Sequence, residues 1–365
     1  MNRKIPLIGI ILIFVLSLVL PQGKASADLN VTDLVFKQTY KGIYDYSNKP
    51  TYKITMPSDG QLNLEFTRSE TADWYLELVD IKTGYVIDDF HTERLPGKDI
   101  RKIGLKKGSY YLQFTSGSNS KEQYQFVATY KTGYYEKEVN NTTKTATSIS
   151  LNKTYKGSRQ HYSDKDYYKF TLKKNGNIAL NITKMPSKYW YVTIINSKGQ
   201  VYLDRYTDSN IYVTGTQKFY LGLPKGTYYV VVNSGSTDNE YSLRVSYVAS
   251  EYYEKEFNNS RTKANSIRTG KYYQGVLQSY SDVDFFKFNV SKKKKVYFYA
   301  ARNTNTYWKV NILNSRGTRI SYFYTRNGSS GSGYERYIKT LNKGTYYMVV
   351  EYGSRDIPYK FKVNY

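Results

Sequence analysis

The sequence contains no cysteine, only two histidines and only eight prolines among its 365 residues. Without cysteine the chain can form no disulfide and carry no thiol-linked lipid, and a thiol nucleophile is excluded. Acidic residues are also in the minority, with 30 Asp and Glu against 54 Lys and Arg, which gives a formal net charge of +24. A protein of this kind must take its stability from packed cores, from bound metal, or from both.

Long apolar runs are scarce too, and the clearest one lies near the first residue. It extends from Ile5 to Leu20, follows two basic residues, and precedes the small residues Ala25-Ser26-Ala27. This order is typical of a cleaved secretory signal peptide. An uncleaved anchor is the alternative, although the run contains Pro6 and is short for a membrane span. We therefore expect residues 1–27 to be removed and the mature chain to be secreted without a membrane span.

The two histidines do not form a recognisable catalytic motif. His161 stands close to Ser163 and Asp164, but the corresponding position 118 residues later is Ser279. The sequence has no His-Glu-x-x-His and no Gly-x-Ser-x-Gly pattern. Asp164 and Asp166 could serve as an acid–base pair, but their place at the start of a strand beside two glutamates fits ligands better. We expect a protein that is not an enzyme.

Tyrosine is abundant instead, with 43 Tyr and 15 Phe, and these aromatic residues favour strands. One motif occurs three times at intervals of 118 residues: Gly108-Ser109-Tyr110-Tyr111, Gly226-Thr227-Tyr228-Tyr229 and Gly344-Thr345-Tyr346-Tyr347. The three tryptophans, Trp74, Trp190 and Trp308, keep nearly the same spacing. The chain therefore divides into three repeats of domain size, at residues 28–131, 132–249 and 250–365.

Inside each repeat the pattern is that of short strands joined by turns. In the second repeat, residues 166–172 alternate between apolar and polar side chains, and a Lys-Lys-Asn-Gly turn follows. Further strands are expected at 177–182, 191–195, 218–221, 227–233 and 241–247. About eight strands per repeat predict an all-β protein of three tandem jelly-roll-like β-sandwich domains.

Two short acidic segments recur in the second and third repeats. The first is Glu136-Lys137-Glu138-Val139-Asn140-Asn141, which returns as Glu254-Lys255-Glu256-Phe257-Asn258-Asn259. The second is Asp164-Lys165-Asp166, which returns as Asp282-Val283-Asp284. Carboxylate and amide oxygens are the ligands that Ca²⁺ prefers, and a divalent cation would relieve the repulsion among four carboxylates. A solvated charged linker and an ordinary acidic turn remain the alternative, but recurrence at a fixed spacing favours calcium.

Together these motifs resemble the bacterial pre-peptidase C-terminal (PPC) domain, and they are similar to the collagen-binding domains of clostridial collagenases. The resemblance rests on Glu-x-Glu-x-Asn-Asn, Asp-x-Asp followed by aromatic residues, and Gly-Thr-Tyr-Tyr. It covers the second and third repeats well and the first more weakly. The family often has proline where this chain has Val139 and Phe257, and its members usually follow a secreted peptidase, which is not seen here.

The resemblance implies a jelly-roll sandwich that holds Ca²⁺ between the two acidic segments. Carried over by position, the implied ligands are Glu136, Glu138, Asn140, Asn141, Asp164 and Asp166 in the second repeat, and Glu254, Glu256, Asn258, Asn259, Asp282 and Asp284 in the third. The first repeat lacks both segments and reads Tyr46-Ser47-Asn48-Lys49-Pro50 where Asp-x-Asp should stand. We expect no comparable site there, with Asp28 and Asp33 as the only residual candidates.

The function that these features predict is binding without catalysis. The tyrosines exceed what three cores can hold, so Tyr228, Tyr229, Tyr346 and Tyr347 are candidates for an exposed binding surface, with one ring of each pair pointing inward. We expect an extracellular protein or polysaccharide as partner, a collagen-like protein or an anionic wall polymer among them, rather than nucleic acid. Two alternatives remain: a basic protein that binds polyanions by charge, and an accessory module or inhibitor that acts with a separate secreted peptidase.

Overall fold

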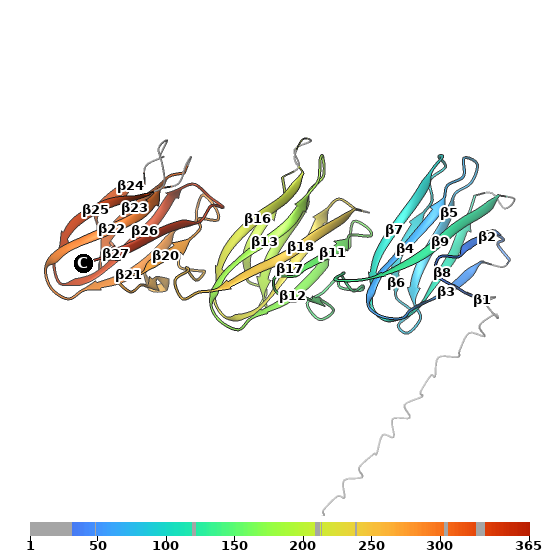
Figure 1. Cartoon of the computed structure of the whole chain (residues 1–365), viewed down its shortest axis with the longest axis horizontal. Coiled ribbons are helices and arrows are strands. Elements are labelled where there is room, and N and C mark those ends of the chain that lie inside the picture. Colours follow the sequence, from blue (N-terminus) through green and yellow to red (C-terminus); the bar gives the residue numbers. More distant parts are fainter. Residues whose placement is uncertain are drawn as a thin grey trace, which may run out of the picture.

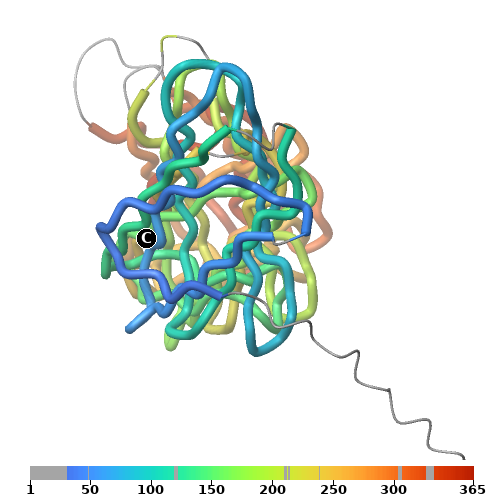
Figure 2. Tube along the Cα trace, turned by 90° about the vertical axis from the view of Figure 1, so that its right-hand side faces the viewer, coloured from blue at the N-terminus to red at the C-terminus, as the bar shows by residue number. Residues whose placement is uncertain are grey.

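The chain forms three β-sandwich modules arranged in a row (Figure 1). The computed structural model describes residues 31–47, 49–118, 122–208, 212, 214–237, 239–302, 306–325 and 333–365. Viewed along the row, the modules project onto one another (Figure 2). The prediction of an all-β protein with tandem jelly-roll-like sandwiches is confirmed, whereas the predicted signal peptide lies outside the described residues. No described helix is long and apolar enough to span a bilayer.

Every module has the same strand order. The first contains β1 (Val31–Asp33), β2 (Thr39–Ile43), β3 (Thr51–Met56), β4 (Gly60–Thr67), β5 (Trp74–Asp80), β6 (Val86–His91), β7 (Lys98–Leu105), β8 (Gly108–Gly117) and β9 (Gln123–Thr132). A five-stranded sheet in the order β1-β3-β8-β5-β6 packs on a four-stranded sheet in the order β2-β9-β4-β7. Only the β1–β3 pair is parallel among the described pairs of this module.

The other two modules repeat this topology. The second contains β10 (Thr147–Ser148), β11 (Thr154–Ser158), β12 (Asp166–Leu172), β13 (Gly176–Lys184), β14 (Trp190–Asn196), β15 (Val201–Tyr206), β16 (Gly215–Leu223), β17 (Gly226–Gly235) and β18 (Glu240–Ala249). The third contains a 3-10 turn (Arg261–Lys263), β19 (Asn265–Ser266), β20 (Tyr272–Gly275), β21 (Asp284–Val290), β22 (Lys294–Arg302), β23 (Trp308–Asn314), β24 (Arg319–Tyr324), β25 (Gly333–Leu341), β26 (Gly344–Gly353) and β27 (Tyr359–Asn364).

Each module has its own core between the two sheets. Strand β12 shows why the sequence folds this way, because its alternate residues Asp166, Tyr168, Phe170 and Leu172 all point inward and are buried. The three tryptophans are almost completely buried, one in each core. The tryptophans are therefore core residues.

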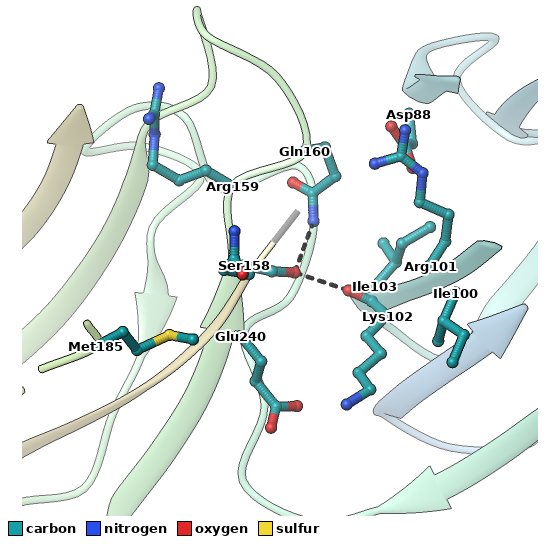
Figure 3. Close-up of a pocket in the computed structure, with 11 residues that line it drawn as sticks. Asp88, Ile100, Arg101, Lys102, Ile103, Ser158, Arg159, Gln160, Met185 and Glu240 are labelled. Atoms are coloured by element: carbon teal, nitrogen blue, oxygen red, sulfur yellow. Dashed lines mark hydrogen bonds between the residues drawn. The ribbon is translucent and has the colours of Figure 1, made fainter. Parts of the chain in front are cut away.

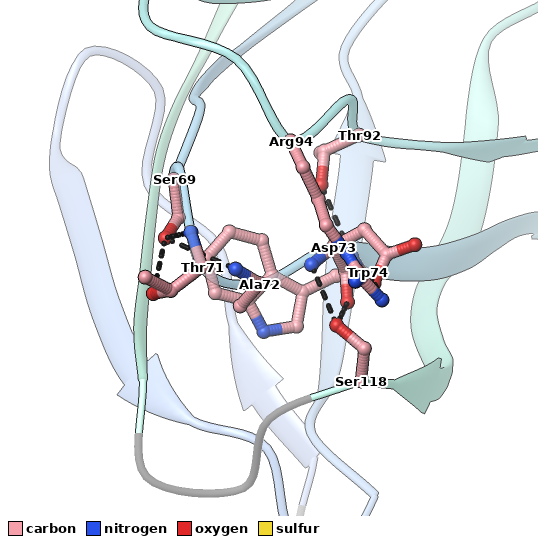
Figure 4. A network of polar contacts seen from close by, with 8 residues as sticks. All are labelled: Ser69, Thr71, Ala72, Asp73, Trp74, Thr92, Arg94 and Ser118. Atoms are coloured by element: carbon pink, nitrogen blue, oxygen red, sulfur yellow. Dashed lines mark hydrogen bonds and ion pairs between the residues drawn. The ribbon is translucent and has the colours of Figure 1, made fainter.

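A threonine fixes the start of each tryptophan strand. The backbone N–H of Trp74 donates to the Thr92 hydroxyl at 3.0 Å, and Trp190 and Trp308 make the same bond to Thr207 and Thr325. In the first module, Asp73 beside the tryptophan also binds Ser118 and Arg94 (Figure 4). These bonds tie β5 to β6 at the edge of the five-stranded sheet, and this edge faces the next module in the row.

Candidate metal centres at the module junctions

The acidic segment that joins the first and second modules runs between two sheets. On one side, the Glu136 N–H donates to the Lys156 carbonyl in β11 at 2.9 Å, and the Lys156 N–H donates to the Tyr134 carbonyl. On the other side, the Glu138 N–H donates to the Gly104 carbonyl in β7 at 2.9 Å. Residues 134–138 therefore bridge the four-stranded sheets of both modules.

The segment between the second and third modules is placed in the same way. The Glu254 N–H donates to the Gln274 carbonyl in β20 at 2.8 Å, and the Glu256 N–H donates to the Gly222 carbonyl in β16 at 3.1 Å. The residue after the second glutamate packs on the preceding module in both cases. Val139 contacts the first core, and the Phe257 ring lies 4.8 Å from that of Tyr202. This contact explains why an apolar residue fits at position 139 and at position 257.

Each junction brings three carboxylates together. Single oxygens of Glu136, Glu138 and Asp166 lie within 4.8 Å of one another, and so do those of Glu254, Glu256 and Asp284. All six residues are buried. The glutamates come from the joining segment and the aspartate from the first residue of β12 or β21. The two acidic motifs that lie far apart in the sequence thus meet in space.

Several of these oxygens have no hydrogen-bond partner among the described residues. They are Glu138 Oε1 and Asp166 Oδ1 in the second module, and Glu256 Oε2 and Asp284 Oδ1 in the third. The side-chain amides of Asn140 and Asn258 are also fully buried, and neither polar atom has a partner within the described part of the chain. Buried polar atoms are normally paired, so this convergence of unpaired oxygens fits a hard divalent cation.

The electrostatics of the cluster also favour a bound cation. Burial, followed by repulsion from Asp166 and Glu138, raises the pKa of Glu136 well above its ordinary value. Burial and repulsion from Asp164 likewise raise the pKa of Asp166. Burial and repulsion from Asp284 and its neighbours raise the pKa values of Glu254 and Glu256. Without a cation, these carboxyl groups hold protons to a higher pH than exposed ones do.

The remaining predicted ligands lie at the margin of each cluster. Asp164 accepts a hydrogen bond from the Gln160 N–H at 2.9 Å, and Asp282 accepts one from Gln278 at 2.7 Å. Asn259 is exposed and its amide donates to Asp282 at 2.9 Å. Asn141 keeps a buried oxygen without a partner among the described residues. The two aspartates thus shape the loop beside the cluster, with Asn259 turned towards that loop.

Sequence reasoning missed three tyrosines that contact the clusters, of which Tyr168 donates to Glu136 Oε2 at 3.2 Å. The Tyr241 hydroxyl donates to Asp166 Oδ2 at 2.5 Å, and the Tyr359 hydroxyl lies 2.5 Å from Asp284 Oδ2 and 3.0 Å from Glu254 Oε2. Both are fully or almost fully buried at the start of the last strand of their module. Their signal in the sequence is only that a tyrosine follows the acidic pair by 75 residues in both repeats.

Two glycines leave room for the glutamates. A Cβ at Gly157 would clash with Tyr168 and come within 2.5 Å of Glu136 Oε2. A Cβ at Gly275 would clash with both Tyr359 and Glu254. Neither glycine has a positive φ, so the requirement is for space rather than for backbone freedom. Gly157 and Gly275 are therefore each part of the candidate metal site in their module.

The first module has a different arrangement at this place. Pro50, just before β3, takes the position that Asp166, the first residue of β12, has in the second module. The Tyr124 hydroxyl is hydrogen-bonded to the Tyr52 hydroxyl at 2.8 Å. The described residues contain two acidic clusters of three, and both lie in the other modules. Asp33 is exposed, and Asp28 lies outside the described part of the chain.

The predicted tyrosine surface is wrong. Tyr228, Tyr229, Tyr346 and Tyr347 are only 2%, 8%, 9% and 8% exposed. They lie on β17 and β26, the central strands of their five-stranded sheets, and five successive residues of each strand are buried, so both faces are covered. Tyr228, for example, stacks on Phe170 with ring centroids 5.6 Å apart.

Exposed aromatic rings lie instead at or next to the edges of the five-stranded sheets that are formed by β6, β15 and β24. The half-buried Tyr191 and the exposed Tyr206 lie tilted against each other across β14 and β15 with ring centroids 4.6 Å apart, and Tyr75 and His91 stack across β5 and β6 at 5.2 Å. In the third module, Tyr322 and Tyr324 on β24 lie 6.1 Å apart. These six residues, which we call the edge aromatics, are spread over the outer sheet surfaces of the three modules.

Comparisons with solved structures find weak similarities. No protein-family model matches the chain. A pre-peptidase C-terminal domain of collagenase from Bacillus anthracis is 19% identical, with 28% of this chain and 94% of that chain covered at a TM-score of 0.22. A structure of Sulfolobus turreted icosahedral virus is 10% identical, with 88% and 83% covered at a TM-score of 0.28. Neither similarity assigns this chain to a family.

Proposed function

We propose that this chain is a secreted, non-catalytic, calcium-binding protein of tandem PPC-like modules, which attaches to extracellular matrix or to a cell surface. One observation carries the proposal: at each of the two junctions, buried carboxylate oxygens converge within 4.8 Å and several lack any partner among the described residues. Burying such groups without a cation is costly, which supports a structural ion at each junction.

The donor set favours calcium over other metals. The carboxylates of Glu136, Glu138 and Asp166 and the amide oxygen of Asn140 would all be oxygen ligands, and no histidine or cysteine belongs to either cluster. Zinc and copper sites normally include nitrogen or sulfur ligands, whereas Ca²⁺ takes carboxylate and amide oxygens. Bound there, the ion would hold the joining segment against the following module, whose β12 or β21 supplies the aspartate ligand. The bonds of the same segment to β7 or β16 of the preceding module would then help to fix the relative orientation of the two modules.

Isothermal titration calorimetry tests the metal. We expect the chelator-treated protein to bind two Ca²⁺ ions, and Asp166→Asn or Asp284→Asn to remove one of them each. Asp33→Asn, an exposed change in the first module, serves as the control and should leave both ions in place. If the unchanged protein takes up no Ca²⁺, or if its melting temperature is the same in EDTA and in Ca²⁺, the proposal fails.

For the surface that makes the attachment, the edge aromatics are the better candidates, because flat exposed rings contribute strongly to binding. The net charge of +24 favours a second candidate, a wall- or exopolymer-associated protein that binds polyanions. Binding to collagen, peptidoglycan and an anionic polymer, each measured at rising salt, separates the two. Charge-driven binding should collapse in moderate salt, whereas aromatic contacts should persist. Turnover of a peptide or glycan library would overturn the non-catalytic proposal.

A further inference from the structure

The outer face of the four-stranded sheet in the third module carries aromatic rings and cations side by side. In β20, β27 and β22, the residues that alternate with core residues such as Tyr273, Phe361 and Phe298 point away from the core. Strand β25 completes this face at the edge of the sheet. We call six of the outward residues the basic tyrosine face: Tyr272, Tyr299, Tyr334, Lys360, Lys362 and Arg336.

The rings of this face hold its two lysines in place. The Nζ atoms of Lys360 and Lys362 lie 4.7 and 4.6 Å from the centre of the Tyr272 ring. Lys362 Nζ is also 4.8 Å from the centre of the Tyr299 ring. Tyr334, on the opposite edge strand, meets Tyr272 with ring centroids 5.1 Å apart. Cation–π contacts of this kind order the ammonium groups, so less conformational entropy is lost when a ligand binds.

The cations of the basic tyrosine face remain accessible to a ligand. Lys360 and Lys362 are partly exposed, Arg336 is exposed, and none of the three has an acidic partner among the described residues. An ammonium group has three N–H donors, so one that lies over a ring keeps donors for an acceptor. Glu335, the only acid in the four described strands of this sheet, alternates to the other face. The face is therefore positively charged.

The other two modules lack this combination at the same positions. Strand pairing places one residue from each of four strands in a row, which in the third module consists of Tyr272, Lys362, Tyr299 and Arg336. The same row in the second module consists of Thr154, Arg244, Asn181 and Lys218. In the first module it consists of Thr39, Val127, Glu65 and Ile100. The fold therefore requires no ring in this row.

The charge and the polar groups of the face indicate the class of partner. Single-stranded nucleic acid stacks its bases on bare aromatic rings, whereas the rings of Tyr272 and Tyr299 are flanked by ammonium groups. Phenol hydroxyls both donate and accept hydrogen bonds, which suits a ligand rich in hydroxyl groups. A linear polymer that carries acidic groups among neutral hydroxyls complements both features.

We propose that the basic tyrosine face binds an anionic polysaccharide. Lys360, Lys362 and Arg336 contact the acidic groups of the polymer, and the phenol hydroxyls contact its neutral hydroxyls. The proposal rests on the second candidate function, the binding of polyanions, and assigns that binding to one sheet face of the third module.

This face is distinct from the metal centres. Lys360 points to the opposite side of the sheet from Tyr359, whose hydroxyl contacts Asp284. The cavity of about 400 Å³ at the first junction (Figure 3), by contrast, belongs to a metal centre, because the Ser158 N–H in its wall donates to Glu136 at 2.9 Å.

Biolayer interferometry on the purified full chain in Ca²⁺ buffer tests the proposal. The probes are hyaluronan, which carries carboxylates, and chondroitin sulfate, which adds sulfates. Dextran is the neutral comparator, and oligo-dT and poly-glutamate represent other polyanions. We expect at least one of the two acidic polysaccharides to bind and dextran not to bind. Lys362→Gln combined with Arg336→Gln should weaken that binding about tenfold.

The matched control removes two charges from the same row of the second module, by Arg244→Gln combined with Lys218→Gln, and should change the affinity less than about twofold. Both double variants lower the net charge equally, so a difference between them reports the face rather than the total charge. Tyr272→Thr combined with Tyr299→Asn introduces the residues of the second module and keeps the charge. It should weaken binding about fivefold, because the lysines lose their rings.

The proposal is overturned if neither acidic polysaccharide binds, if oligo-dT or poly-glutamate binds more tightly, or if the two charge variants weaken binding equally. Equal weakening would leave polyanion binding by total charge intact, whereas the absence of binding to every polyanion would remove the second candidate function as well. Exposed charge substitutions seldom prevent folding, so the comparison does not depend on the tyrosine variant.

Discussion

At each junction, carboxylates that repel one another are kept out of water. Neutralising one of them should therefore have opposite effects with and without a cation. In EDTA we expect Asp166→Asn to raise the melting temperature of the second module by a few degrees, since it removes a buried like charge. In Ca²⁺ it should lower the melting temperature, because a ligand is lost. Differential scanning calorimetry under both conditions measures the change of sign.

Asp284→Asn provides an independent copy of this experiment in the third module. Both substitutions should show the same reversal, and Asp33→Asn should show none. A variant that is destabilised equally in EDTA and in Ca²⁺ would mean that Asp166 is only a structural hydrogen-bonding group.

The tyrosine hydroxyls hydrogen-bond to the carboxylates, so we expect them to orient the ligands rather than to bind the ion themselves. Tyr241→Phe removes the donor to Asp166, and Tyr359→Phe removes the donor to Asp284 and Glu254. Partners of this kind hold ligands in place, so we expect the Ca²⁺ affinity of the affected site to fall about tenfold. Tyr124→Phe is the matched control, because its hydroxyl meets only Tyr52 among the described residues. Equal Ca²⁺ affinities for all three variants and the unchanged chain would rule this positioning role out.

The raised pKa values predict that calcium stabilises the protein more strongly as the pH rises. In the metal-free protein, burial holds protons on Glu136 and Asp166 above the pH at which the unfolded chain releases them. Their contribution to metal-free stability is thus present at acid pH and is lost as the pH rises. Calcium must displace these protons. The difference in melting temperature between Ca²⁺ and EDTA should therefore be larger at pH 8 than at pH 5, and an equal or reversed difference would contradict the assignment.

Much of each cluster could be predicted at the residue scale, because the acids are close together in two short repeated motifs. Tyr241 and Gly157 could not, since each contacts the site only after strands distant in sequence have paired. The error over Tyr228 and Tyr346 has a related cause. Alternation shows that one face of a strand is buried, but it does not show that β17 and β26 lie at the centre of their sheets with both faces covered.

The glutamates are held in place because each joining segment runs close to an edge strand, β7 or β16. A Cβ at Gly104 in β7 would clash with Glu136, and one at Gly222 in β16 would clash with Glu254. We expect Gly104→Ala to destabilise the folded junction by about 1–3 kcal/mol and to weaken Ca²⁺ binding at the second module. Gly108→Ala is the control, since the nearest atom to its added Cβ would be 3.5 Å away. Urea unfolding and calorimetry measure the two effects.

Strands with regular alternation were predicted almost to the residue, as the coincidence of residues 166–172 with β12 shows. The short strands β10 and β11 and the edge strand β15 were not predicted. β10 has two residues and exists only because it pairs with β12, and β15 has partly exposed residues on both faces. Such elements depend on tertiary pairing rather than on local pattern.

On the scale of the whole molecule, each junction combines three kinds of contact: strand pairing, apolar packing and an acidic cluster. The first two involve no charged group that a cation would neutralise. Lys137 also pairs with Asp59 at 2.6 Å, and Arg205 with Asp356 at 3.7 Å, but both pairs are partly exposed and so contribute little. The cluster is therefore the component of each junction that solution conditions can change most.

Small-angle X-ray scattering should then report the effect of calcium on the row of modules. In Ca²⁺ we expect a single extended shape, as in Figure 1, with a well-defined maximum dimension. In EDTA, unneutralised carboxylates should push the joining segments away from Asp166 in β12 and Asp284 in β21, so the modules should move relative to one another and the scattering should indicate a flexible ensemble. Asp166→Asn together with Asp284→Asn should make the scattering independent of calcium. Identical curves for the unchanged chain in Ca²⁺ and EDTA would show that packing alone holds the row straight.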